Sequence, residues 1–168
     1  MKFYISMESI CIGTFKLTNS DCYQIVLNAI KIGYRLIDTA TLYGNHLEIR
    51  RAIKDSGIEL KELCICSKIH KSFIKSGKIL EGFESILSEL DIDYIDILLL
   101  HEPYRSKDLK KCNDINTENW RKMEEIYYSG RSKKIGISNY NILDVQNILS
   151  ICKIKPYINQ IELSPFCQ

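Results

Sequence analysis

The chain has 168 residues, a formal net charge of +2 and 45% hydrophobic residues, which suffices for one packed domain but not for two of ordinary size. Its 23 Lys and Arg residues nearly balance 21 Asp and Glu residues and are scattered, which excludes a protein that binds nucleic acid through a basic surface. The longest apolar stretch, 95–100, contains Asp96 and falls far short of the roughly 20 residues that cross a bilayer. We expect a cytoplasmic protein with no membrane or nucleic-acid partner.

The seven cysteines fit reduced thiols better than disulfides or a metal centre. Their number is odd, no C-x-x-C occurs, and none stands at zinc-like spacing from His46, His70 or His101. Cys64 and Cys66 lie two positions apart in an apolar run, which puts both on one face of a strand as small core residues. We therefore expect no metal site and a reducing compartment.

Strand-like and helix-like patterns alternate along almost the whole chain. A helix that Asp21 caps comes first, and Asn45 opens a second helix with Leu47 facing inward. The Lys- and Asp-rich segment 104–116 predicts an exposed, mobile loop. Short apolar runs predict strands at 10–12, 34–38, 63–66, 94–100, 134–137 and 157–163. The five intervening helices are predicted at 21–32, 45–56, 80–90, 118–128 and 142–151.

Regular alternation of strands and helices predicts a parallel sheet with helical crossovers, either doubly wound or closed as a barrel. The glycine-rich phosphate-binding motifs of open sheets do not follow the first strand. Polar residues instead follow successive strands, and in a barrel such positions converge on one rim. These residues are Asp38, Lys68, His101, Ser138 with Asn139, and Gln160. The predicted fold is α/β, a partial TIM (β/α)8 barrel of about six parallel strands.

Three of these polar residues, together with Tyr43, form a plausible proton-donating group for carbonyl reduction: Asp38, Lys68 and His101. A tyrosine hydroxyl, with a reference pKa of about 10, is a poor acid at neutral pH, and lowering that pKa by two units takes about 2.7 kcal/mol. An adjacent lysine ammonium supplies such stabilisation, and a carboxylate orients the lysine. A histidine fixes the direction of the substrate oxygen.

Several segments, in order and at sensible spacing, resemble the aldo-keto reductases. The similarity begins at Gly13-Thr14-Phe15 and extends almost to the last residue. The other segments that carry it are 33–40, Tyr43-Gly44-Asn45, Ser67-Lys68, 93–96, Leu100-His101-Glu102-Pro103, 136–140 and 159–162. The resemblance implies a TIM-type barrel that reduces aldehydes or ketones with NADPH, or with NADH.

The resemblance also implies roles for individual residues. Tyr43, Lys68, Asp38 and His101 match the family's catalytic residues, with the tyrosine as general acid. Ser138, Asn139 and Gln160 match those that hold the nicotinamide carboxamide, and Gly13, Thr14 and Phe15 match a turn against the same end of the cofactor. Asp38 is counted with both groups. The partner implied is a small carbonyl compound.

Three positions depart from the common pattern of the family. His46 stands where glutamate is frequent, and Leu163-Ser164 replaces a frequent Cys-His. Glu102 stands where tryptophan often follows the histidine. Its carboxylate either borders the substrate or faces solvent.

The length also departs from the family, because a barrel of this kind typically needs about 250 residues and eight strands. We expect residues 1–168 to form one incomplete barrel domain, without the family's aromatic that stacks on the nicotinamide and without its basic grip on the adenosine phosphate. Open sheet edges invite self-association or a complementing chain. Three explanations stay open: an interrupted gene, a half-barrel completed by a second polypeptide, and an inactive paralogue that serves as a binding module.

Overall fold

The computed structural model describes residues 10–167, in which six parallel strands form one curled sheet. Each strand pairs with the next one along the chain, so that the spatial order equals the sequence order. The strands are β1 (Cys11–Gly13), β2 (Leu36–Asp38), β3 (Cys64–Ile69), β4 (Ile95–Leu100), β5 (Ser132–Ser138) and β6 (Asn159–Gln160). The predicted α/β fold, a partial barrel, is confirmed.

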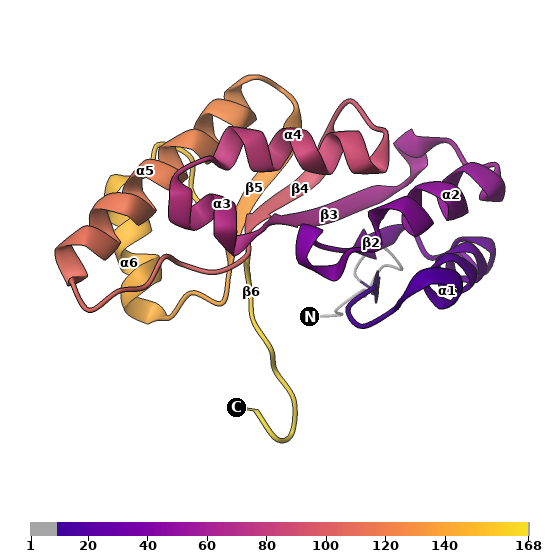
Figure 1. Cartoon of the computed structure of the whole chain (residues 1–168), viewed down its shortest axis with the longest axis horizontal. Coiled ribbons are helices and arrows are strands. Elements are labelled where there is room, and N and C mark those ends of the chain that lie inside the picture. The colour runs from indigo at the N-terminus through magenta and orange to yellow at the C-terminus, as the bar shows by residue number, and fades with distance from the viewer. Residues whose placement is uncertain (1–9, 168) are drawn as a thin grey trace, which may run out of the picture.

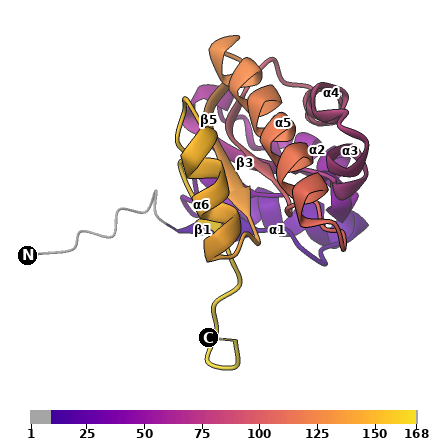
Figure 2. The same ribbon diagram turned by 90° about the vertical axis from the view of Figure 1, so that its left-hand side faces the viewer.

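The helices lie on the outer, convex face of the sheet, and the segment after β6 runs away from it in both views (Figures 1 and 2). They are α1 (Asn19–Lys31), α2 (His46–Ser56), α3 (Lys71–Ser76), α4 (Ile79–Leu90), α5 (Leu109–Tyr128) and α6 (Ile142–Ile151). Two short 3-10 turns, η2 (Thr41–Tyr43) and η3 (Leu60–Glu62), precede α2 and β3. No helix within residues 10–167 is long and apolar enough to cross a membrane.

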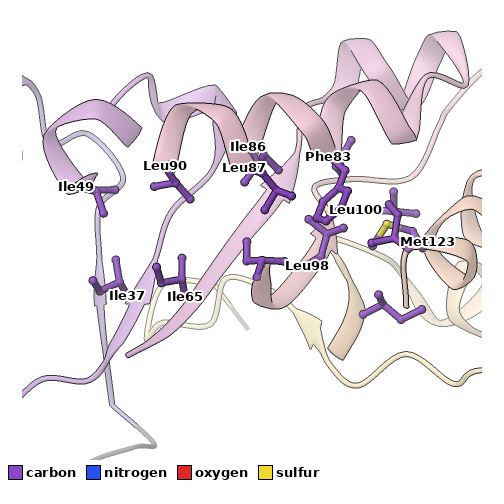
Figure 3. Packing of buried hydrophobic residues seen from close by; sticks show 14 of the residues in the cluster. Ile37, Ile49, Ile65, Phe83, Ile86, Leu87, Leu90, Leu98, Leu100 and Met123 are labelled. Carbon is purple, nitrogen blue, oxygen red and sulfur yellow. The ribbon is translucent and has the colours of Figure 1, made fainter. Parts of the chain in front are cut away.

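Alternation along the strands builds the main hydrophobic core between the sheet and the helices. Successive side chains of a strand point to opposite faces, and the outward set of β2 to β5 packs beneath the helices (Figure 3). That set includes Ile37, which lies beneath Ile49 of α2, and Ile65, Leu98 and Leu100. The α4 residues of the same cluster are Phe83, Ile86, Leu87 and Leu90. Burial of this continuous apolar layer is the main source of stability for the sheet.

The opposite set of side chains forms a smaller cluster on the inner, concave face. Cys66, Ile97 and Leu99 are buried there, with Cys64 and Ile158 packed against them. The expectation that Cys64 and Cys66 share one face is confirmed, although Cys64 is only partly buried. The same alternation continues to the strand ends, where it places Asp38, Lys68 and Ser138 on the inner face.

Two helical segments differ from the sequence-based prediction. Residues 104–116 are not one loop, because α5 begins at Leu109, where the Asp108 side chain accepts a hydrogen bond from the Lys111 amide at 3.0 Å. Asn116 then bonds the backbone of Tyr104 in both directions. The prediction also missed α3, a six-residue helix that Gly77 ends at φ 71°. It is too short to show a helical period.

Smaller differences concern the ends and faces of the elements. Thr18, not Asp21, occupies the N-cap position of α1, and Leu47 is exposed rather than inward. β2 and β6 are shorter than predicted, at three and two residues. A prediction from residue propensity depends on local composition, whereas the length of a strand is set by its neighbours in the sheet.

Candidate active site

The carboxyl ends of β2 and β3 hold a buried ion pair. The ammonium of Lys68 donates hydrogen bonds to both carboxylate oxygens of Asp38, each at 2.8 Å, and to the carbonyl oxygen of Thr39 at 3.0 Å. Lys68 is 1% exposed. Burial by itself would lower the pKa of Lys68, but the charge and hydrogen bonds of Asp38 outweigh it and hold that pKa above its ordinary value. Lys68 is therefore a fixed cation at neutral pH.

Tyr43 lies next to this ion pair, at the end of η2. Lys68 Nζ donates to the Tyr43 hydroxyl oxygen at 3.3 Å, and the same ammonium lies 5.1 Å from the centre of the Tyr43 ring. The Tyr43 ring packs against Phe15 and, edge to face, against His101, with ring centres 5.1 and 5.9 Å apart. These contacts fix the phenol with its oxygen beside a positive charge.

His101 follows β4 on the same rim and is neutral at physiological pH. Burial, and secondarily the positive charge of Lys68, lower the pKa of His101 to about 4. A neutral imidazole keeps one N–H donor. His101 can therefore donate a hydrogen bond to a carbonyl oxygen without competing with Tyr43 as an acid.

The predicted cofactor-side residues come from β5 and β6. Asn139, at φ 61°, donates to the His101 carbonyl at 3.0 Å and to Ser138 Oγ at 3.2 Å. Ser138 Oγ donates to the Gln160 carbonyl at 2.9 Å, and Gln160 Nε2 donates to Asp38 Oδ1 at 3.1 Å. Three strands separate β2 from β6 in the sheet, so this last contact forms only because the sheet curls.

The turn after β1 is tied to the same rim. The backbone amide and the hydroxyl of Thr14 both donate to the Asp38 carbonyl oxygen at 3.0 Å. Asn45 opens α2 as predicted, at the N-cap position, and its side chain donates to the carbonyls of Thr14 and Leu17 at 2.8 and 3.0 Å. The turn that contains Gly13 and Phe15 is thereby held against β2.

A cavity of about 410 Å³ opens between these groups. Leu42, Ile161 and Glu162 also line it, and they were not singled out from the sequence. Asp38, Gly13 and Thr14 do not line the cavity and support it from behind. Of the predicted site residues, those that line it are Phe15, Tyr43, Lys68, His101, Ser138, Asn139 and Gln160.

The amide groups of this cavity are chemically suited to a nicotinamide carboxamide. Among the described residues, Asn139 Oδ1 and Gln160 Oε1 accept no hydrogen bond, whereas the nitrogens of both amides are occupied by protein oxygens. Two such oxygens are acceptors for the N–H donors of a carboxamide. The residues present therefore fit the group.

His46, one of the three departures from the family pattern, lies at the start of α2 and supports the site through its side-chain contacts. It is buried, and its Nδ1 lies 2.6 Å from Glu89 Oε2 while Nε2 lies 3.2 Å from Ser67 Oγ. A carboxylate only accepts, which assigns the proton to Nδ1 and makes Ser67 the donor to Nε2. Burial lowers the pKa of His46 despite the opposing effect of Glu89. The contacts connect α2 and α4 to β3 immediately before Lys68.

Cys66, on the inner face, is not available as a nucleophile. Burial, and secondarily the charge of Asp38, raise the pKa of its thiol well above the ordinary value. The groups of the rim that are available for chemistry are therefore a phenol, an ammonium and a neutral imidazole.

Comparison with known proteins agrees with this geometry. Residues 9–168 match the model of the aldo/keto reductase family, and the chain belongs to that family. A glyoxal reductase of Bacillus subtilis is 36% identical over 162 residues, which are 96% of this chain and 56% of that protein. An NADPH-dependent D-xylose reductase of Candida boidinii is 34% identical over an alignment 184 residues long, which covers 96% of this chain and 57% of that protein.

A crystal structure of an aldo/keto reductase from Brucella melitensis superposes with a TM-score of 0.84 at 34% identity, covering 94% of this chain and 59% of that one. The chain thus spans somewhat more than half the length of the relatives that it matches. The family predicted from the sequence is confirmed.

Proposed function

We propose that this chain contributes the proton-donating half of an NADPH-dependent carbonyl reductase. The observation that carries the proposal is the contact of the Lys68 ammonium with both Asp38 and the Tyr43 hydroxyl. The similarity to a glyoxal reductase and to an NADPH-dependent xylose reductase supports the same reaction class. NADH is the alternative cofactor.

In the proposed reaction the substrate oxygen lies between Tyr43 and His101. Neutral His101 donates a hydrogen bond that orients the oxygen, and Tyr43 gives it a proton as the carbonyl becomes an alkoxide. Lys68 stabilises the negative charge left on the Tyr43 oxygen, and a proton from solvent restores the phenol. Asp38 keeps Lys68 charged and in place. Bound NADPH would supply the hydride that adds to the carbonyl carbon and would leave as NADP⁺.

Ser138, Asn139 and Gln160 are proposed to hold the carboxamide end of the cofactor. The two acceptor-free amide oxygens support this assignment. Gly13, Thr14 and Phe15 are proposed to border the same end, because Phe15 lines the cavity and Thr14 fastens the turn.

Replacing Tyr43 by phenylalanine tests the assignment. Removing a general acid is expected to lower the rate of aldehyde reduction by about 10²- to 10⁴-fold while the fold persists, since within residues 10–167 the hydroxyl accepts a single long hydrogen bond. The measurement is NADPH oxidation in the presence of glyoxal. Equal rates for the wild type and Tyr43→Phe would refute the role of Tyr43.

A second candidate function, docking of further βα units, rests on the surface beside β6. Tyr157, Ile161, Leu163 and Phe166 are at least half exposed there, and among the described strands β6 pairs with β5 alone. The matched relatives continue well beyond the shared segment, and we propose that units of this kind, on this or a second polypeptide, cover the surface.

This docking function is tested by co-expression with the unmatched part of the B. subtilis glyoxal reductase. A stable one-to-one complex is expected in which Phe166 is protected from solvent. Failure to form any complex under conditions where both pieces stay in solution would contradict it.

A further inference from the structure

A second cleft adjoins the candidate active site. It has a volume of about 750 Å³ and is walled by the residues that follow β3 and β4 at the carboxyl ends of the strands. Asn139 lines both this cleft and the catalytic cavity. Among the residues that line the second cleft, Ile74 and Pro103 are buried. A ligand whose reacting end lies at Tyr43 therefore has room to extend past Asn139.

The walls of this cleft carry an excess of positive charge. Lys71 and Lys75 project from α3, are exposed, and form no ion pair within residues 10–167. Arg105, on the opposite wall, is paired with Asp144 at 2.7 Å and 3.3 Å. Glu102 is the one carboxylate among the lining residues. Two unpaired ammonium groups against one carboxylate leave the cleft positive.

His70, which lines this cleft, adds a hydrogen-bond donor. Its Nδ1 accepts a hydrogen bond from the Ser72 amide at 3.2 Å, and a nitrogen that accepts carries no proton, which leaves the proton on Nε2. The charge of Lys71 also acts on His101, since it contributes to the low pKa of that imidazole. The cleft and the catalytic rim are thus electrostatically connected.

We propose that this cleft binds an anionic group, a carboxylate or a phosphate, at the far end of the carbonyl substrate, with Lys71 and Lys75 as its principal contacts. This assignment rests on the proposed function and deepens it by naming the substrate class: short aldehydes or ketones that carry a negative charge. Glu102, which departs from the family pattern, lies on the same rim and disfavours a second negative charge near His101.

The first experiment needs no turnover. Succinate is titrated into the full chain while backbone amide resonances are followed by NMR. Saturable shifts are expected at residues 70–75 and 102–105, and the Lys71→Met/Lys75→Met double variant should bind roughly 5- to 20-fold more weakly, as expected for two exposed ion pairs. Added salt should weaken binding in the wild type.

Lys61→Met is the matched control, because it removes an exposed lysine from η3, at the opposite end of β3, and should leave the affinity unchanged. Absence of shifts at these residues, or equal affinity in the double variant, would overturn the proposal. Displacement of succinate by saturating NADPH would assign the cleft to a cofactor phosphate and would also overturn it.

The second experiment compares two four-carbon aldehydes, succinic semialdehyde and butanal. The wild type is expected to prefer the charged aldehyde in kcat/KM by roughly 5- to 20-fold, and the double variant should lose that ratio while Lys61→Met keeps it. Reduction of both aldehydes at equal kcat/KM would overturn the anion site and leave the proposed function standing. Reduction of neither would overturn the proposed function, and the succinate titration would still decide the cleft.

Discussion

Asp38 and Lys68 lie on the inner face of β2 and β3, two strands whose outer face is packed against helices, whereas Gln160 lies on a two-residue strand at the edge of the sheet. On the first side of the rim the ammonium has three acceptors within 3.0 Å and is almost fully buried. On the second side, two hydrogen bonds hold the Ser138 hydroxyl and one holds the Gln160 side chain, and the chain that follows is exposed. The proposed proton donation would therefore depend on contacts within β2 to β4, and the proposed carboxamide binding on the last strand pair.

The largest expected effect comes from breaking the buried ion pair. Lys68→Met leaves the Asp38 carboxylate, 13% exposed, without its cation, and removing one partner of a buried pair costs about 3–5 kcal/mol. The free energy of unfolding, measured by urea denaturation, should fall by that amount.

Two further variants sharpen the result for the ion pair. The Asp38→Asn/Lys68→Met double variant should recover much of the loss because no charge is left buried, and Gln160→Ala should cost only about 1 kcal/mol. A loss in Lys68→Met no larger than that in Gln160→Ala would show that the two halves of the rim do not differ.

Gly136→Ala is expected to have the next largest effect, on the side of the rim that β5 and β6 form. A Cβ at Gly136 would lie 2.7 Å from Leu99 Cδ2 and 2.8 Å from the backbone oxygen of Ile158. The backbone cannot move without disturbing the pairing of β5 with β6, so we expect a loss of about 1–3 kcal/mol. Faster amide hydrogen exchange at Ile137 and Asn139 would accompany it. Unchanged exchange there would contradict the close packing.

The pH dependence of stability should report on His101. Its pKa is lowered to about 4 in the folded chain, against about 6.5 when unfolded. Between these two pH values His101 therefore binds a proton in the unfolded chain and stays neutral in the folded chain. The free energy of unfolding should therefore decrease as the pH falls from about 6.5 to about 4. His46, whose pKa is also lowered, acts in the same direction.

Comparing the wild type with His101→Asn isolates this contribution from that of the other groups. The slope of stability against pH should be smaller in the variant over this range. Identical slopes would mean that His101 is as easily protonated in the folded chain as in the unfolded one.

The smallest expected effect is at Tyr140, on the β6 side. Its hydroxyl is buried and has no hydrogen-bond partner among the described residues, and burial raises the pKa of this phenol. Because an unsatisfied buried hydroxyl is destabilising, Tyr140→Phe should leave stability unchanged or raise it by about 1 kcal/mol. Thermal unfolding measures the difference, and a clear loss would reveal a partner for the hydroxyl.

Much of the rim was predictable because it follows from periodicity. Alternation along each strand and the convergence of parallel strand ends suffice to bring Asp38, Lys68 and His101 to one face and one edge. The identity of the family came from short motifs around the same residues, and the comparisons confirm it.

Other features had no local signal in the sequence. The Thr39 carbonyl that binds Lys68 is a backbone atom and is independent of residue type. The contact between Gln160 and Asp38 exists only because of the curl of the sheet, which a linear pattern does not encode. The cleft of Lys71 and Lys75 depends on α3, a helix too short to be predicted by its period.

A single-turnover experiment is the decisive test of whether Tyr43, beside Lys68, protonates a carbonyl that NADPH reduces. Wild type and Tyr43→Phe, each brought to the same NADPH occupancy, are mixed with a small aldehyde, and the alcohol formed is quantified by proton NMR. We expect one equivalent of alcohol from the wild type and almost none from the variant in the same time. Equal yields from both, or no alcohol from a wild-type chain that holds NADPH, would contradict it.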